Sequence, residues 1–585
     1  MALYGGEAGG SVAPMSICLR SRVGLALAMV ASVAEGAAPA FRVRADVTAG
    51  LNADAGWAAG VNEEAVVQAD RPFRVRFEAE RGAVTAGAPG LVIQYRRNGD
   101  EDWIETGAFD FPYPKGEEPR SPRVSVVRTP AYADGAPTRD LLPGSTEPSR
   151  GGVGVNLAAQ APAWFAGEGG QLEYEWPLVI RRFVDGAETN EDGDRFEFRL
   201  SDGLGHALPG ATVAAVRLEV PAGHVGGTFV ETPGRIGPWQ AGNGDLYFIM
   251  DPAESSNLFM MVKSSDGGRS WAEVDAANRP ETDDLESVDG RVVGDTIEIV
   301  HQVTRRVVRH VFRTSDHPTA PDTWAVTDEV GPTVRSVAQA VTMARRSDGS
   351  MVVFFVGETL RHSVRSPNGQ WSESEVVERG AAPLLAGPQA VRGADDAVHV
   401  AYYGADGTAW FRTLAADGTL SAAVQLDDAI GEGRDAYGAV LPLVYLPESD
   451  TVVVVHQRAD LRLWERRITA GGAPTPAVAV SDRPVVREAA DSQQPGADLV
   501  AMGDALHVLF IDDETREIFS VRATGDGTWS APTRRVGGVR ADWVRGAAHA
   551  SPDGGYVVRF VYDGGSGGGA GMNRYAEFKA GANND

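Results

Sequence analysis

Residues 351–357 read MVVFFVG, a run of β-branched and aromatic residues that ends on glycine. Six other segments align with this run: LYFIM from Leu246, IEIVHQ from Ile297, VHVAYYG from Val398, VVVVHQ from Val452, LHVLFID from Leu506 and YVVRFVYD from Tyr556. Their starting positions are 47 to 54 residues apart. A period near 50 residues with several strands in each unit is typical of a β-propeller.

Two other features repeat in the same register. After a short turn, each unit has a second alternating segment that mostly ends on a basic residue, as in LFMMVK (258–263) and AWFR (409–412). A tryptophan often follows the next turn, at Trp271, Trp324, Trp371 and Trp529. We therefore predict an all-β propeller over residues 225–585, with about seven blades and with six as an alternative.

The segment before the repeats also has a strand pattern. FRVRF (73–77), LVIQY (91–95) and RFEFRL (195–200) alternate apolar and polar residues, the pattern of strands with one buried face. Residues 112–165 are rich in Pro, Gly, Ser and Arg, which predicts a long loop. We expect an immunoglobulin-like β-sandwich over residues 41–222.

The first 40 residues are expected to lie outside both folds. Arg20 and Arg22 precede the apolar run VGLALAMVASV (23–33), and small residues follow it, a pattern typical of a bacterial secretory signal peptide. Translation could start at Met1 or at Met15. The predicted location is secreted, periplasmic or at the cell surface. No later stretch reaches the length of a membrane span.

Composition narrows the possible partners. The chain has 585 residues, which indicates two or more domains, and a formal net charge of -26, which disfavours binding to nucleic acid. The 70 glycines fit a fold with many tight turns. No metal-ligand spacing occurs, so we expect no cofactor; the acidity leaves Ca²⁺ open without a motif for it.

One turn matches a known motif at every fixed position. Residues 264–271 read SSDGGRSW, in which Ser264, Asp266, Gly268 and Trp271 are the motif residues. The aspartate can accept bonds from the backbone of its own turn, glycine permits positive φ, and the tryptophan can pack between blades. Degenerate versions occur at equivalent places in other repeats. The chain thus resembles the Asp-box (BNR-repeat) propellers of the sialidase superfamily, in which this turn is structural and lies away from the active centre.

The resemblance implies roles for a few residues of the first repeat. Arg235-Ile236-Gly237-Pro238 is similar to the Arg-Ile-Pro motif of those enzymes, with the proline one residue late. By this analogy Arg235 would bind a substrate carboxylate, and Asp251 or Glu254 would be a general acid. The arginine triad and the Tyr/Glu nucleophile pair of sialidases have no match here. A count near seven is closer to polysaccharide-lyase propellers, whose Tyr or His base would correspond to Tyr437 or His301.

Propeller ligands usually lie over the central channel, on residues that enter the innermost strands. Besides Arg235, the candidates for substrate binding at these positions are Asp284, Glu286, Arg335, Gln339, Asp435, Asp491, Gln494, Trp543 and Arg545. Arginine, carboxylates, glutamine and tryptophan form a common sugar-binding set. The same residues could instead pair with one another around a wet channel.

Two functions follow from these patterns. The first is an exported glycoside hydrolase or lyase that acts on acidic glycans at the channel mouth. The alternative is a non-catalytic propeller that binds glycans or protein at the cell surface. The expected partner is a glycan or polysaccharide in either case, and the sequence predicts neither its identity nor the oligomeric state.

Overall fold

The computed structural model describes most of the chain after residue 38. The described residues are 39–45, 49–80, 90–108, 123–127, 129, 131–143, 152–156, 171–184, 188–221, 223–225, 232–250, 259–274, 279–281, 287–303, 306–314, 324–330, 341–356, 359–380, 388–428, 430, 441–469, 473–487, 495–524, 527–551, 555–563 and 573–580. Of the predicted N-terminal segment 1–40 only residues 39 and 40 are described, and Ala40 already belongs to the sandwich, because it is buried and its amide donates to Glu78 Oε2 at 2.7 Å. Within them the elements are strands apart from one short 3-10 helix, η1 (Ala394–Asp396).

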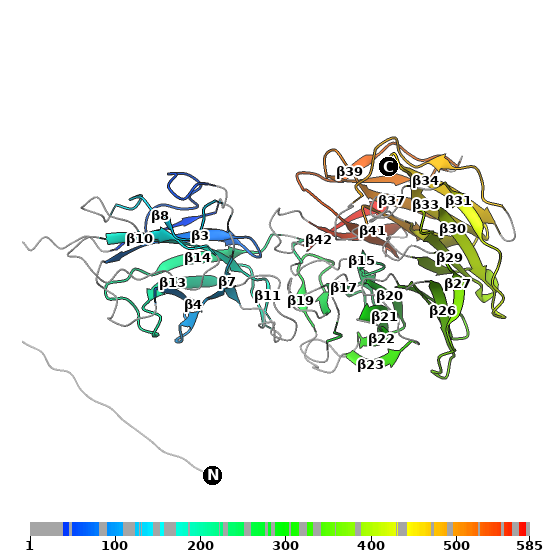
Figure 1. Ribbon diagram of the computed structural model, residues 1–585, viewed down its shortest axis with the longest axis horizontal. Coiled ribbons are helices and arrows are strands. Elements are labelled where there is room, and N and C mark those ends of the chain that lie inside the picture. Colours follow the sequence, from blue (N-terminus) through cyan, green and yellow to red (C-terminus); the bar gives the residue numbers. More distant parts are fainter. Residues whose placement is uncertain are drawn as a thin grey trace, which may run out of the picture.

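Residues 41–219 form two sheets that pack face to face (Figure 1). The first has the order β1 (Phe41–Arg44), β3 (Phe73–Glu80), β10 (Gln171–Ile180), β7 (Val124–Val126) and β6 (Gly107–Ala108), with β9 (Val153–Gly154) beside β10 and β8 (Ala136–Pro137) beside β9. The second has the order β2 (Ala65–Gln68), β14 (Ala214–Glu219), β13 (Arg195–Ser201), β4 (Val92–Arg97) and β5 (Ile104–Glu105). A separate hairpin joins β11 (Phe183–Val184) to β12 (Glu188–Thr189).

The alternation in the sequence explains the core of this sandwich. Phe73, Val75 and Phe77 of β3 point inward, and the ring of Phe73 meets that of Phe198 from the second sheet edge-on at 6.0 Å. Every second residue of these strands joins one shared apolar cluster. Both sheets therefore depend on the same buried core for their stability.

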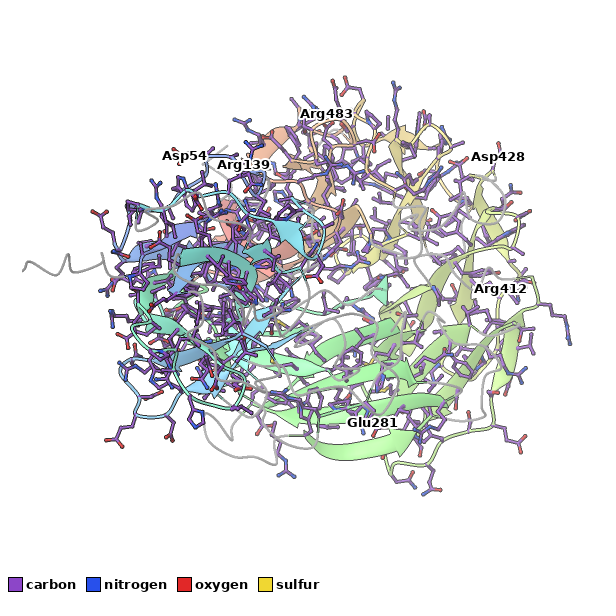
Figure 2. All side chains as sticks on the ribbon, turned by 60° about the vertical axis from the view of Figure 1, so that its left-hand side comes forward. Asp54, Arg139, Glu281, Arg412, Asp428 and Arg483 are labelled. Carbon is purple, nitrogen blue, oxygen red and sulfur yellow. The ribbon has the colours of Figure 1, made fainter. Side chains whose placement is uncertain are left out.

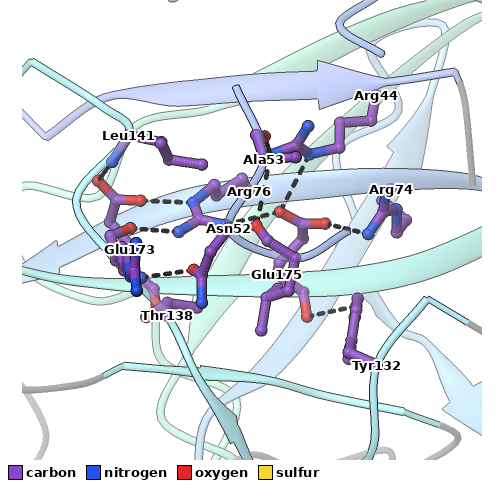
Figure 3. A network of polar contacts seen from close by, with 12 residues as sticks. Arg44, Asn52, Ala53, Arg74, Arg76, Tyr132, Thr138, Leu141, Glu173 and Glu175 are labelled. Atoms are coloured by element: carbon purple, nitrogen blue, oxygen red, sulfur yellow. Dashed lines mark hydrogen bonds and ion pairs between the residues drawn. The ribbon is translucent and has the colours of Figure 1, made fainter. Parts of the chain in front are cut away.

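The outer face of β3 and β10 departs from the predicted exposure. Arg74, Arg76, Glu173 and Glu175 point away from the core, yet all four side chains are buried, as is Arg44 of β1 (Figure 3). Glu175 lies at the centre of this group: its carboxylate is 2.8 Å from Arg74 Nη1, 2.9 Å from Arg76 Nη1 and 3.4 Å from Arg44 Nε. Arg76 Nε also donates to Glu173.

Two connecting segments cover this charged face. From residues 49–57, the carbonyl of Leu51 accepts a bond of 2.9 Å from Arg76, and the indole of Trp57 lies 3.5 Å from the Arg44 guanidinium. From residues 131–142, the amides of Leu141 and Leu142 donate to Glu173 Oε1, each at 2.7 Å. The segments thus exclude water from the ion pairs, which strengthens the pairs and makes an unmatched charge costly.

The described strands after residue 231 form seven sheets, which we number as blades in chain order. Blade 1 has β16 (Trp239–Gln240), β17 (Leu246–Met250), β18 (Met260–Ser264) and β19 (Ala272–Glu273); blade 2 has β15 (Thr232–Pro233), β20 (Ser287–Val293), β21 (Thr296–Val303), β22 (Arg306–Arg313) and β23 (Trp324–Glu329). Blade 3 has β24 (Val341–Arg345), β25 (Met351–Val356), β26 (Leu360–Arg365) and β27 (Glu375–Glu378).

The other four blades follow the same order. Blade 4 has β28 (Gln389–Arg392), β29 (Val398–Tyr403), β30 (Ala409–Leu414) and β31 (Val424–Asp427); blade 5 has β32 (Leu443–Leu446), β33 (Thr451–Gln457), β34 (Leu463–Thr469) and β35 (Val478–Ala479). Blade 6 has β36 (Ala497–Met502), β37 (Ala505–Ile511), β38 (Ile518–Arg522) and β39 (Thr533–Val536), and blade 7 has β40 (Val544–Ala550), β41 (Tyr556–Asp563) and β42 (Asn573–Ala580).

These sheets have the arrangement of a β-propeller. Each is an antiparallel meander, apart from the parallel addition of β15 to β20, and the first strand of each blade from β20 to β40 lies beside the first strand of the next. The blades follow one another in colour order from green to red in Figure 1. The aligned segments of the sequence are the second strands of the blades.

The ring closes on a segment that precedes blade 1. Residues 223–225 pair with β42: Val225 N donates to Asn573 O at 2.8 Å, and Tyr575 N donates to Gly223 O at 2.8 Å. His224 faces Arg574 in this antiparallel bridge. The segment therefore supplies a fourth extended chain to blade 7, so the start and the end of the propeller meet in one sheet.

The same segment joins the propeller to the sandwich. His224 Nε2 lies 2.8 Å from Asp70 Oδ2, and both side chains are buried. Nearby, Arg182 Nη2 donates to the carbonyl of Trp271 in blade 1 at 2.7 Å. These contacts fix the end of the sandwich against blades 1 and 7.

We predict that Glu175→Gln lowers the free energy of unfolding by about 3 kcal/mol, because three buried arginines lose their shared counter-charge. Glu197→Gln is the matched control, since its arginine partners Arg96 and Arg195 are 30% and 41% exposed; we expect it to cost less than about 1 kcal/mol. Urea denaturation measures both, and equal losses would contradict the network's role.

Candidate functional site

Most of the predicted channel residues cannot be placed. Asp251, Glu254, Tyr437, Asp284, Glu286, Arg335, Gln339, Asp435, Asp491 and Gln494 lie outside the described residues. Arg235, His301, Trp543 and Arg545 lie inside them. The structure therefore reports on one of the four predicted catalytic residues and on three of the predicted binding residues.

Arg235 is held in a network of bonds at the innermost strands. Its Nε donates to Asp289 Oδ1 at 2.7 Å and its Nη2 donates to Asp289 Oδ2, so the guanidinium fork already binds a carboxylate. Nη2 also donates to the carbonyl of Met343 at 2.6 Å, and Nη1 to that of Ala390 at 3.2 Å. The side chain stays 38% exposed, but the edge that would bind a substrate carboxylate is engaged by Asp289.

Asp289 is ionised in this pair. Its burial alone would raise the pKa of the carboxyl, but the charge and hydrogen bonds of Arg235, with bonds from Met343 N and Thr342 Oγ1, lower the pKa below its usual range. The ion pair therefore connects the segment before blade 1 to blades 2 and 3. This arrangement makes Arg235 a structural connector of the inner ring.

The same kind of contact recurs around the ring. Thr342 Oγ1 of blade 3 accepts the amide of Ala390 in blade 4 at 3.0 Å. Asp498 Oδ2 of blade 6 accepts the amide of Gly546 in blade 7 at 2.9 Å. The inner strands of blades 2, 3 and 6 thus each offer a side-chain acceptor to the backbone of the next inner strand, where no ladder partner exists.

Arg545 forms the second ion pair of the inner strands. Its Nη1 lies 3.5 Å from Asp498 Oδ1 and donates to Ala497 O at 3.2 Å. Burial raises the pKa of Asp498 and lowers that of Arg545. Because Arg545 is only 3% exposed, it offers little surface to a ligand.

Trp543 and His301 are also enclosed, contrary to the roles that the sequence suggested. The Trp543 ring is 0% exposed and stacks on Phe248 of blade 1 at 6.4 Å, which leaves no face for a sugar. His301 is 0% exposed and its Nε2 lies 2.7 Å from Nε2 of His310. Burial, followed by the His310 charge, lowers the pKa of His301 well below its ordinary value, so this imidazole is neutral and has no route to a substrate.

The Ser264–Trp271 turn forms a compact network of its own. Asp266 Oδ1 accepts the amides of Arg269 and Ser270, each at 3.0 Å, and the Ser264 hydroxyl at 2.8 Å. The indole of Trp271 is 1% exposed and donates to Gly268 O at 3.2 Å. The Asp266 carboxylate is therefore occupied by hydrogen bonds from its own turn, as expected for a structural role.

Gly268 shows why this turn excludes other residues. Its φ is +90°, and a Cβ there would lie 2.1 Å from Cε1 of Tyr575 in blade 7. The ring of Tyr575 also lies 5.6 Å from that of Trp271. The turn therefore packs on the last blade, next to the junction with the sandwich.

The blade 4–5 seam combines an arginine, a carboxylate and an indole. Arg458 Nε donates to Asp427 Oδ2 at 2.8 Å, and its guanidinium lies 3.8 Å from the centroid of the Trp464 ring. His456 bonds to the same Asp427 oxygen. Burial opposes ionisation of Asp427, but the bonds from His456 and Arg458 hold the pKa of this carboxyl below its usual range.

Trp464 in this seam has an unused donor. The residue is partly exposed, yet its Nε1 is buried and has no acceptor in the described part of the chain. A buried donor without a partner costs about 1–3 kcal/mol, so a buried water at this N–H would be favourable.

The two neighbouring seams hold similar sets, with an indole at one and a phenol at the other. At the blade 5–6 seam, Trp529 Nε1 donates to Glu465 Oε2 at 2.7 Å, and Arg467 pairs with the same carboxylate. At the blade 3–4 seam, Glu378 Oε2 accepts the Tyr402 hydroxyl at 3.3 Å and Arg412 Nη2 at 3.2 Å.

Figure 2 shows Arg412 on the side of the propeller away from the sandwich. Three consecutive seams therefore each combine an arginine, a carboxylate and an aromatic side chain; Tyr402 is buried, whereas Trp464 and Trp529 are partly exposed.

None of these seam residues is among the ligand-binding candidates that the sequence pattern indicates. Their signal was weak, because Arg458 and Trp464 belong to different parts of a repeat and Asp427 belongs to the preceding one. Only the packing of successive blades brings them together. One usable hint was the polar residue that ends an outer strand, as in Glu378 of EVVE and Asp427 of VQLD.

The described residues contain neither a candidate membrane-spanning helix nor a candidate metal-binding cluster. No helix there is both long and apolar enough to span a membrane. In the same part of the chain, no group of three or more His, Cys, Asp or Glu side chains is arranged to hold a metal ion.

Comparisons with known proteins give similarities of fold. No family model matches the chain, and no curated protein matches it. The BP39L lectin from Burkholderia pseudomallei is 10% identical, with 62% of this chain and 97% of that chain covered and a TM-score of 0.45.

Two fungal structures give comparable values. A six-bladed β-propeller lectin from Aleuria aurantia is 12% identical, with 51% and 93% covered and a TM-score of 0.34. A fungal alcohol oxidase in complex with copper is 11% identical, with 61% and 75% covered and a TM-score of 0.40. Similarities of this size do not define a function, and the strand order above is the basis for the propeller.

We predict that the buried histidines make the protein less stable in acid. Burial, followed by the Arg309 charge, lowers the pKa of His310 from 6.5 to about 4, so the unfolded chain binds the proton first as the pH falls. The contribution of His310 to the free energy of unfolding is therefore fully present above pH 6.5 and is lost as the pH falls toward 4. At pH 5 the loss is about 2 kcal/mol.

Urea denaturation at pH 7.5 and 5 measures this loss. His310→Gln should lose about 2 kcal/mol less than the unchanged protein over this interval, whereas His206→Gln, at a side chain that is 77% exposed, should behave like the unchanged protein. Identical acid sensitivity in His310→Gln would contradict the assignment.

Proposed function

We propose that the protein is a non-catalytic carbohydrate-binding propeller whose ligand sites lie at the seams between blades. The observation that carries the proposal is the recurrence of an arginine, a carboxylate and an aromatic donor in direct contact at the seams of blades 3–4, 4–5 and 5–6. Arginines and carboxylates bind sugar hydroxyls, and an indole stacks on the apolar face of a pyranose.

The blade 4–5 seam is the strongest of the three sites. Arg458 is held by Asp427 while its side chain remains 32% exposed, so part of this side chain is accessible in a fixed orientation. Trp464 adds a partly exposed ring and an unused N–H. A pre-organised set of this kind binds a ligand with little loss of side-chain entropy.

The hypothesis of a hydrolase or lyase is the second candidate function, after glycan binding. It is weakened because His301, the one predicted catalytic residue inside the described ranges, is buried and neutral. The similarity to sialidase active-site residues is limited to the first repeat, and the Asp266 carboxylate of its turn accepts bonds from the backbone. We further propose, from the apolar run at residues 23–33 alone, that binding takes place outside the cytoplasm.

We predict that Trp464→Ala weakens glycan binding about tenfold, because one stacking contact is worth about 1.4 kcal/mol. The measurement is a glycan array to find ligands, followed by titration calorimetry with the best of them. Trp103→Ala is the matched control: its indole also lies on arginines, at 4.7 Å from Arg96 and 4.2 Å from Arg199, but on the sandwich. The control should bind as the unchanged protein does.

Three results would contradict the proposal. The first is the absence of binding to every glycan on the array. The second is unchanged affinity in Trp464→Ala. The third is the release of cleaved or unsaturated sugar during the titration, which would support the hydrolase or lyase hypothesis instead.

A further inference from the structure

The seam between blades 2 and 3 has an apolar half and a charged half. Val300 and Val307 of blade 2 pack there against Met343 and Phe355 of blade 3. Toward the far end of the inner strand β24, the apolar residues give way to arginines and carboxylates from both blades. Among the described residues of this seam, the charged half is the part that the apolar core does not explain.

Two carboxylates of blade 2 organise the charged half. Glu298 accepts Arg309 Nη2 at 2.6 Å and Arg345 Nη1 at 2.8 and 2.9 Å. Asp328 accepts Arg309 Nη1 and Arg365 Nε, each at 3.0 Å. Arg345 and Arg365 come from blade 3, so these pairs connect the two blades.

Arg291 is the fourth arginine of this group and makes no such pair. It lies directly opposite Glu298 in the β20–β21 register. Its Nε is buried without an acceptor, and no hydrogen bond or ion pair joins it to another residue in the described ranges. The side chain is partly exposed, so solvent reaches it.

The group therefore carries four positive charges against two negative ones. This surplus lies inside a protein whose formal net charge is -26. A partly buried cation without a counter-ion is costly, and the cost appears in the titration of the group. Burial, followed by the nearby charge of Arg235, lowers the pKa of Arg291 to about 10.

We propose that Arg291, together with Arg345, binds the carboxylate or sulfate group of an acidic sugar at the blade 2–3 seam. This inference rests on the proposed function and deepens it by naming the chemical class of the ligand. An oxyanion would satisfy the unused donors of Arg291 and would offset the surplus charge. Arg345 is 27% exposed, and Glu298 uses only its Nη1, so the outer edge of its guanidinium can contribute a second contact.

The ligand chemistry follows from this geometry. Two neighbouring guanidinium groups with a net surplus of about two charges match one carboxylate or sulfate group. A nucleic acid is disfavoured, because the rest of the chain would repel a polyanion. A neutral sugar would leave the charge unmatched.

The test compares glucuronate and glucose 6-sulfate with glucose and with inorganic sulfate, all at equal ionic strength. The readouts are the melting temperature and titration calorimetry. We expect both sugar acids to raise the melting temperature and to bind at least tenfold more tightly than glucose. Arg291→Gln should lose this preference while melting at the same or a higher temperature without ligand, because it removes an unmatched charge.

Two further variants keep the test decisive. Arg291→Lys keeps the charge without the fork, so we expect it to bind the sugar acids several-fold more weakly. Arg392→Gln is the matched control: Arg392 ends β28 as Arg345 ends β24, and it lies in a loose pair 3.8 Å from Asp396 with 46% exposure. This control should keep the full preference.

The possible failures are distinguishable. Binding of neutral glycans through Trp464 without any preference for the sugar acids would overturn this inference and leave the proposed function standing. An undiminished preference in Arg291→Gln would overturn the assignment of the site. If inorganic sulfate binds but neither glucuronate nor glucose 6-sulfate does, the assignment of an acidic sugar as the ligand is wrong.

Discussion

The closure of the propeller ring is the constraint on which the rest of the structure depends. Residues 223–225 pair with β42, so the first and last parts of the propeller share one sheet. This pairing brings blade 7 against blade 1, where Trp543 stacks on Phe248 and Tyr575 contacts Trp271. It also places His224 against Asp70 of the sandwich. One short segment therefore closes the ring and anchors the neighbouring fold.

Ring closure explains why the seams differ from one another. The inner strands have no ladder partners across a seam, so acceptors such as Asp289, Thr342 and Asp498 bind the backbone of the next blade. Farther out, some seams are filled by apolar side chains, as between blades 6 and 7, and others carry ion pairs. Charged and aromatic groups that remain partly exposed at a seam are available to a ligand, whereas Arg235 and Arg545 of the inner ring are already engaged by Asp289 and Asp498.

The strands of this fold are largely readable from the sequence, since alternation reports directly on which side chains are buried. Leu246, Met351 and Val398 are the first residues of β17, β25 and β29, as the repeat indicates. The sequence pattern does not show which sheet faces are covered by other segments. Arg74 and Glu175 have the spacing of solvent-facing residues, but segments 49–57 and 131–142 enclose them. The second segment lies within residues 112–165, for which the composition predicts a long loop, yet that stretch holds the short strands β7, β8 and β9.

The site was less predictable for the same physical reason. Arg235 and Trp543 have the right chemistry for a sugar site, but their partners Asp289 and Phe248 lie in other repeats, and these contacts occupy them. The seam residues Asp427, Arg458 and Trp464 become one site only when two blades pack. The repeat of about 50 residues locates the strands. It does not predict the contacts between blades, because these depend on individual side chains that differ from one repeat to the next.

A crystal structure of the protein with the tightest-binding glycan is the most direct test of the central claim, that ligands bind at the seams and are not transformed. The account predicts an intact glycan between blades 4 and 5, within hydrogen-bond distance of Arg458 and against the ring of Trp464. An intact or cleaved glycan over the central channel, with that seam empty, would contradict it.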